Sequence, residues 1–126
     1  FSDIDDCIYC IDKLMTDKSI VSQTVNIGPD EEFVTINELF KIISNKLKFN
    51  QEPKYFADRP NEVKHATCSS DKARKILNYK TTVSLDQSID KVIKYIQEKG
   101  TKKFQYNYIL EIDNEKTPKT WKEKLF

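Results

Sequence analysis

Two short stretches, Thr24-Val25-Asn26-Ile27-Gly28-Pro29-Asp30 and Thr35-Ile36-Asn37-Glu38, decide the expected fold. The first starts with strand-forming residues and closes on a Gly-Pro turn signal, so it predicts a short strand. In the second, the Thr35 hydroxyl can accept the Glu38 amide while the Glu38 side chain reaches back, which is a capping box. A helix is therefore expected from there to about Leu47 or Lys48, with one apolar face (Ile36, Leu39, Phe40, Ile43 and Leu47).

A second strand is expected beyond that helix, at Pro53-Lys54-Tyr55-Phe56. A strand, a crossover helix and a second strand in this order favour a parallel pair with a right-handed connection. The sequence therefore predicts an α/β fold, a small mixed domain with three main helices and a few short strands.

Helices are also expected on either side of this unit. Residues 3–15 carry apolar residues at helical spacing (Ile4, Cys7, Ile8, Ile11, Leu14 and Met15) and acids in the first turn, which suit the helix dipole. A short helix opens at Ser69-Ser70-Asp71 and ends near Leu77. The strongest pattern follows a second capping box, Ser84-Leu85-Asp86-Gln87, and ends on Gly100 as a C-terminal cap.

The character of the chain changes after Gly100. Aromatic and aliphatic residues alternate with polar ones (Phe104, Tyr106, Tyr108, Leu110 and Ile112), which predicts a strand or an extended arm. The charged stretch 115–126 is expected to lie on another surface, anchored by Trp121, Leu125 and Phe126. The expected organisation is a domain over residues 1–100 and an extended tail over residues 101–126.

Composition excludes several classes of function. The chain has 126 residues, 33% of them charged, yet its net charge is only +1, which does not indicate a nucleic-acid or membrane-surface partner. Apolar runs are too short to span a membrane, and three cysteines without a disulfide framework favour a reduced, cytoplasmic setting. Two glycines, Gly28 and Gly100, cannot form a glycine-rich dinucleotide loop. Because the chain starts at Phe1, a truncated or processed piece is expected.

Two groups of residues could carry chemistry. The pairs Cys7-x-x-Cys10 and His65-x-x-Cys68 supply four possible zinc ligands, although Cys7 falls on an apolar helical stripe where a small hydrophobic residue is expected. The loop Asp58-Arg59-Pro60-Asn61-Glu62 offers a guanidinium that can grip two phosphate oxygens beside a carboxylate. On spacing alone, a surface ion pair is the favoured interpretation of that loop.

A family resemblance favours the phosphate-binding interpretation of this loop instead. Six stretches occur in the same order and at similar spacing as in the C-terminal part of nucleotide-sugar epimerases and dehydratases, which are extended short-chain dehydrogenase/reductase proteins such as UDP-glucose 4-epimerase. The resemblance covers Phe1 to about Gly100, and Thr117-Pro118-Lys119-Thr120-Trp121 also looks like the ending of some bacterial members. The stretches are Phe1-Ser2-Asp3-Ile4-Asp5-Asp6, Asn26-Ile27-Gly28, Thr35-Ile36-Asn37-Glu38-Leu39, Asp58-Arg59-Pro60-Asn61-Glu62-Val63, Ser70-Asp71-Lys72-Ala73 and Leu77-Asn78-Tyr79.

The resemblance implies roles for individual residues. Arg59 matches the arginine that grips the diphosphate of the sugar nucleotide, and Glu62 matches the acid that binds the ribose hydroxyls. Pro60 and Asn61 shape this substrate-binding loop, where the family usually has glycine at the position of Asn61. Asp6 matches a largely structural position. The family's glycine-rich NAD loop and Tyr-x-x-x-Lys catalytic pair belong upstream of these stretches.

The resemblance therefore implies the nucleotide-sugar-binding portion of an NAD-dependent epimerase (an isomerase) or dehydratase, inactive by itself. A UDP-sugar is the expected ligand, and NAD is expected only in the full-length enzyme. Cut off from the NAD-binding Rossmann portion, the chain should expose apolar surface and form a homo-oligomer. Two alternatives stay open: a zinc-stabilised binding module using Cys7, Cys10, His65 and Cys68, and a stand-alone interaction domain whose aromatic tail docks on a partner.

Overall fold

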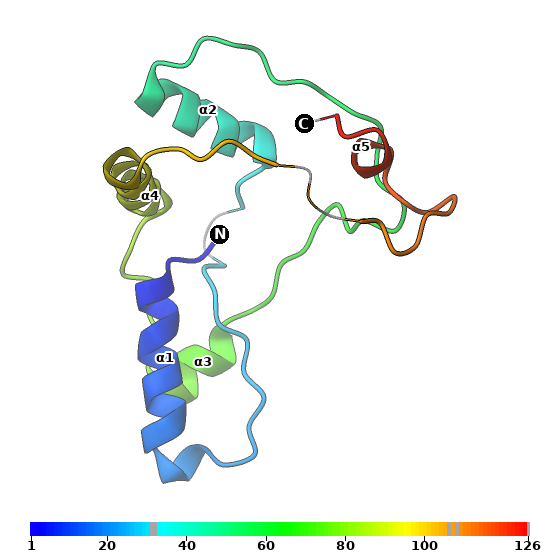
Figure 1. Ribbon diagram of the computed structural model, residues 1–126. Helices are drawn as coiled ribbons and strands as arrows, with labels where there is room; N and C mark the ends of the chain where they lie inside the picture. The colour runs from blue at the N-terminus through cyan, green and yellow to red at the C-terminus, as the bar shows by residue number, and fades with distance from the viewer. Residues whose placement is uncertain (31–32, 106, 108, 126) are drawn as a thin grey trace.

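The computed structural model describes residues 1–30, 33–105, 107 and 109–125, and within these residues helices are the only regular secondary structure (Figure 1). No strand occurs in these ranges, so the predicted α/β fold is wrong. The helices, in chain order, are α1 (Ile4–Thr16), the 3-10 turn η1 (Lys18–Ile20), α2 (Ile36–Leu47), α3 (Asp71–Leu77), α4 (Leu85–Lys99) and α5 (Lys119–Lys122).

The expected strands failed because a strand needs a neighbour to pair with. Residues 24–27 and 53–56 lie outside any helix, but neither stretch forms a backbone ladder with another described segment. Val25 and Ile27 instead pack their side chains against a helical core, and Tyr55 is 74% exposed. In the alternating stretch 104–112, Tyr106 and Tyr108 lie outside the described residues, and the rest forms no strand.

Local capping explains where the long helices begin. The Asp3 carboxylate accepts the Asp5 amide at 3.0 Å and starts α1. Both predicted capping boxes are confirmed. The Glu38 amide donates to the Thr35 hydroxyl at 3.2 Å while the Thr35 amide donates back to Glu38 at 2.7 Å.

The same exchange starts α4. The Gln87 backbone amide donates to the Ser84 hydroxyl at 3.3 Å, and the Ser84 backbone amide donates to the side-chain oxygen Oε1 of Gln87 at 3.0 Å. Gly100 ends α4 as predicted, with a φ of 78° that disfavours a side chain.

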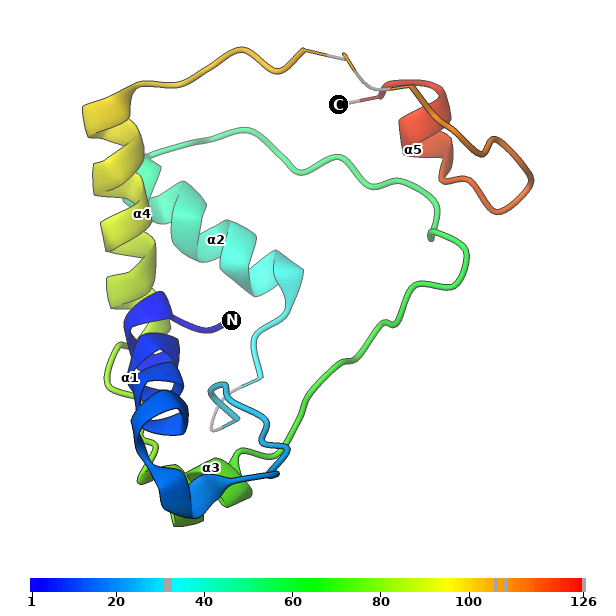
Figure 2. The ribbon, with the colours of Figure 1, turned by 60° about the horizontal axis from the view of Figure 1, so that its bottom comes forward.

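The core lies between α1 and α3, which stand side by side in Figures 1 and 2. The Tyr9 hydroxyl of α1 donates to the Leu77 carbonyl of α3 at 3.2 Å. The core includes four buried residues, Cys10, Ala73, Leu77 and Tyr79, with Ile20, Val25, Ile27 and Ile76 packed around them. Of the six residues in the predicted apolar pattern of α1, none is buried, because the helix turns Asp6 and Cys10 inward instead.

Helix α4 is held to its neighbours chiefly by lysine–carboxylate pairs. Lys46 of α2 contacts Asp86 at 2.9 Å and Asp90 at 2.7 Å on α4. Lys91 of α4 contacts Asp5 of α1 at 2.7 Å. Figure 2 shows α2 and α4 close together, above α1 and α3.

The chain beyond Gly100 leaves this group of helices. Its described residues form no helix or strand before α5, which stands apart from α1 and α3 in both ribbon views (Figures 1 and 2). Trp121 and Leu125, two of the predicted anchors, are 40% and 38% exposed, and Phe126 lies outside the described residues. Among the described residues, no helix has the length and apolar character needed to cross a membrane.

Candidate functional site

The loop 58–62 forms a tight turn that brings Arg59 and Glu62 together. The Glu62 amide donates to the Arg59 carbonyl at 3.4 Å, which closes the turn. Pro60 occupies its second position, and Asn61 occupies its third with a φ of 60°. Proline followed by a residue of positive φ is the signature of a type II turn. The positive φ also explains why glycine or asparagine suits the position of Asn61.

Arg59 and Glu62 form a two-point ion pair on this turn. Arg59 Nε donates to Glu62 Oε2 at 2.9 Å, and the Nη2 group donates to Oε1. The hydrogen bonds to Glu62 raise the pKa of Arg59. About half of each side chain is exposed, 48% for Arg59 and 45% for Glu62. An exposed pair of this kind contributes little stability, so a stronger anion can replace the carboxylate.

A second exposed pair flanks the first. Lys64 Nζ lies 2.8 Å from Asp58 Oδ2, and both side chains are more than 70% exposed. Their hydrogen bond raises the pKa of Lys64 and lowers that of Asp58. Sequence reasoning missed Lys64, although its position six residues after Asp58, across a proline turn, could have suggested it. The loop thus presents two cations and two carboxylates within seven residues.

The candidate zinc ligands are not gathered into a site. Cys10 is buried in the core, where loss of solvent raises the pKa of its thiol, whereas Cys68 is exposed. The His65 ring packs on Phe33 at 5.8 Å between centroids. Among the described residues, which include all four, no three His, Cys, Asp or Glu side chains are placed to hold a metal.

The chain's own residues do not fit an NAD site. Gly28 is used internally, because a side chain there would meet Ser2 Oγ at 3.3 Å, and Gly100 caps α4. With no other glycines, the chain has no loop through which a backbone could approach a pyrophosphate closely.

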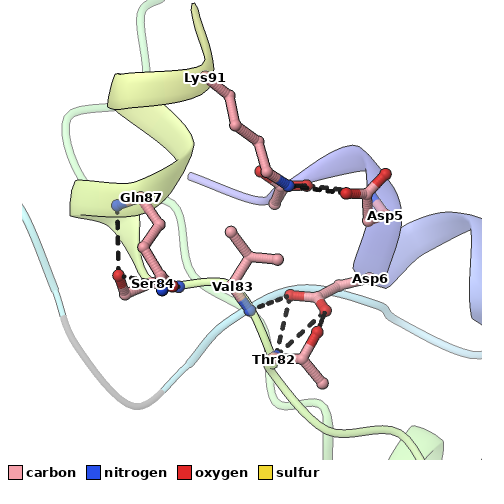
Figure 3. A network of polar contacts seen from close by, with 8 residues as sticks. Asp5, Asp6, Thr82, Val83, Ser84, Gln87 and Lys91 are labelled. Carbon is pink, nitrogen blue, oxygen red and sulfur yellow. Dashed lines mark hydrogen bonds and ion pairs between the residues drawn. The ribbon is translucent and has the colours of Figure 1, made fainter.

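Asp6 of α1 is part of a polar network that joins α1 to the segment just before α4 (Figure 3). Its carboxylate accepts the amides of Thr82 at 3.1 Å and Val83 at 3.4 Å, and the Thr82 hydroxyl. These bonds hold the segment leading into α4 against α1. The network supports the largely structural role expected for Asp6.

A third polar cluster was missed by sequence reasoning. Asp30 accepts the Ser70 amide at 2.7 Å and pairs with Arg74 of α3. The fully buried Ser70 hydroxyl donates to the Gly28 carbonyl at 2.6 Å. The cluster fastens residues 28–30 to the start of α3. Because the bonded partners lie at least 40 residues apart in the sequence, no local pattern predicts them.

No protein-family model, curated protein or solved structure matches the chain. The loop 58–64 is the candidate functional site on its geometry and charge.

Proposed function

We propose that this chain binds the diphosphate end of a nucleotide sugar, with a UDP-sugar as the first ligand to test. In this proposal residues 1–100 form the substrate-binding portion of a nucleotide-sugar epimerase or dehydratase, and the cofactor-binding portion precedes them. The observation that carries the proposal is the turn 59–62, which presents an exposed guanidinium and an exposed carboxylate side by side.

The guanidinium suits a diphosphate because its two N–H edges match pairs of anionic oxygens. Arg59 already makes such a two-point contact with Glu62. A diphosphate carries more negative charge than one carboxylate and can therefore displace it. Glu62, once released, can accept hydrogen bonds from the ribose hydroxyls.

The role of the site is to fix the position of the substrate. Holding the nucleotide end fixes the sugar relative to reacting groups elsewhere, which lowers the entropic part of the barrier. No residue of this chain is assigned a step in the reaction itself.

Calorimetry with UDP-glucose on the full-length protein tests the proposal. Arg59→Ala should weaken binding at least ten-fold, because a charge-assisted hydrogen bond contributes about 1.5–3 kcal/mol. Lys75→Ala is the matched control, since it removes an exposed cation of α3 outside the loop 58–64, and its affinity should stay within about two-fold. Equal affinity of Arg59→Ala and the unmodified protein would exclude Arg59 as the diphosphate ligand.

Glu62→Gln separates the two parts of the proposed contact. The amide cannot form the ion pair with Arg59, so Arg59 becomes available to the diphosphate, while ribose recognition weakens. UDP-glucose should lose affinity relative to its 2′,3′-dideoxyribose analogue. A loss that is the same for both ligands would argue against a ribose role for Glu62.

A further inference from the structure

The loop 58–64 holds two ion pairs, one nested inside the other in the sequence. The inner pair joins Arg59 to Glu62 through two hydrogen bonds, and the outer pair joins Lys64 Nζ to Asp58 Oδ2 at 2.8 Å. Each pair crosses the turn, so each side of the turn presents one cation and one carboxylate. The proposed function uses only the inner pair. The outer pair places a second cation on the same turn.

Lys64 can exchange its carboxylate partner for another anion. Its side chain is 72% exposed and that of Asp58 is 78% exposed, and an exposed ion pair contributes little stability. The lysine ammonium group is a point charge with three donors on a flexible stem, so it can follow a phosphate group over a range of positions. Lys64 is therefore suited to bind an anion that reaches this turn.

Two cations match the charge pattern of one class of ligand. In a nucleotide sugar, the two phosphate groups share a bridging oxygen, and each of them keeps one negative charge. Arg59 alone balances one of these charges and leaves the second. Lys64, which lies on the other side of the turn from Arg59, supplies the second positive charge.

We propose that Lys64 binds the second phosphate group of the ligand, so that the loop 58–64 selects a diphosphate over a monophosphate. This inference rests on the proposed function, in which Arg59 binds the diphosphate. On binding, Arg59 and Lys64 both exchange a carboxylate partner for phosphate oxygens, and no covalent bond changes. Asp58 is released into solvent, just as Glu62 is released toward the ribose.

Three uridine ligands separate the contributions to binding. At pH 8 the phosphate of uridine monophosphate (UMP) has lost its second proton, whose pKa is about 6. UMP then carries the same total charge as UDP-glucose, but on one phosphate group instead of two. UDP has the second phosphate group without the sugar. Chemical-shift titrations of the 126-residue chain measure all three affinities, and UDP-glucose and UDP should bind about ten-fold more tightly than UMP.

Lys64→Ala should remove most of this preference. Its affinity for UDP-glucose and UDP should fall about ten-fold, because a charge-assisted hydrogen bond is lost, while its affinity for UMP stays within about two-fold. Lys64→Arg should keep the preference, since the positive charge remains. Lys75→Ala, which removes an exposed cation of α3, should bind like the unmodified chain. Equal losses for all three ligands in Lys64→Ala would overturn the proposal, as would a loss confined to UDP-glucose, which would indicate a contact with the sugar.

Asp58→Asn should change the affinity in the opposite direction. The amide cannot form the ion pair with Lys64, so the cation is available before the ligand arrives. UDP-glucose and UDP should bind about two-fold more tightly, and UMP should gain less because it needs only Arg59. A loss of affinity for UDP, or an equal gain for all three ligands, would contradict the exchange of Asp58 for a phosphate group.

The two proposals fail separately. Weaker UDP-glucose binding in Arg59→Ala, with no change in Lys64→Ala, would reject the role of Lys64 and retain the proposed function. Weaker binding in Lys64→Ala, with no change in Arg59→Ala, would reject Arg59 as the diphosphate ligand and retain Lys64 as a phosphate-binding residue. If none of the three ligands binds the unmodified chain, both proposals are overturned.

Discussion

Asp6 is only 5% exposed, and it connects segments that are 76 residues apart in the sequence. Its two oxygens accept from the amides of Thr82 and Val83 and from the Thr82 hydroxyl. A buried carboxylate is stable only when its lone pairs are satisfied, and here backbone donors do so. The start of α4 therefore depends on one side chain of α1.

Replacing Asp6 by alanine should lower the free energy of unfolding by about 2 kcal/mol, because the Thr82 and Val83 donors lose their acceptor. Asp6→Asn should lower it less, since one oxygen acceptor remains. Asp12→Ala, at an exposed position of the same helix, should change it by less than about 0.5 kcal/mol. Urea titrations followed by circular dichroism measure all three, and equal effects of Asp6→Ala and Asp12→Ala would contradict the role given to Asp6.

Asp30 should make the free energy of unfolding depend on pH in the acid range. Hydrogen bonds from Arg74, and then from the Ser70 amide, lower the pKa of Asp30 to about 2. The carboxylate of an unfolded chain titrates near about 3.9. The native state therefore holds fewer protons between these values, and the stabilisation is complete above pH 4 and is lost as the pH falls toward 2.

Asp30→Asn should flatten this part of the pH profile. The urea midpoint of each protein is expressed relative to its own value at pH 7. Between pH 4 and pH 2, this midpoint should fall further for the unmodified chain than for Asp30→Asn. Parallel curves for the two proteins would show that the Asp30–Arg74 pair does not carry the acid sensitivity.

At the scale of the elements, local signals were sufficient to place the four longest helices, α1 to α4, whereas the short elements η1 and α5 were not predicted. Each capping box needs only residues three apart, and both form as expected. The turn at Arg59 and Glu62 was visible for the same reason, since Pro60 and the pair's spacing are local. Strands at 24–27 and 53–56 were wrong because pairing depends on a distant partner. The Asp30–Arg74 pair could not be foreseen, because its partners lie 44 residues apart.

Helix α4 should depend strongly on its cap. It has 15 residues but only Ile89 is buried, so tertiary packing supplies little of its stability. Ser84→Ala should remove about 1 kcal/mol and fray the first turn, because the Gln87 amide loses its acceptor. Ser84→Asp keeps an acceptor and should preserve the helix. Amide hydrogen exchange in residues 85–88 measures the effect, and unchanged protection in Ser84→Ala would show that the cap is not what holds this end.

On the scale of the whole molecule, the exposed surface limits how cooperatively the 126-residue chain can unfold. Fully unfolded, a chain of 14.8 kDa exposes about 21,000 Å², so this one buries about three quarters of what a compact domain of its length buries. The dependence of unfolding free energy on denaturant, the m-value, scales with that buried area. Folding of the isolated chain should therefore respond weakly to urea.

The m-value in urea should be about a quarter lower than that of a compact 126-residue domain. Circular dichroism at 222 nm, at several protein concentrations, measures it. A full-sized m-value for the 126-residue chain, independent of concentration, would mean that the exposed apolar side chains of α1, α2 and α4 are buried in solution.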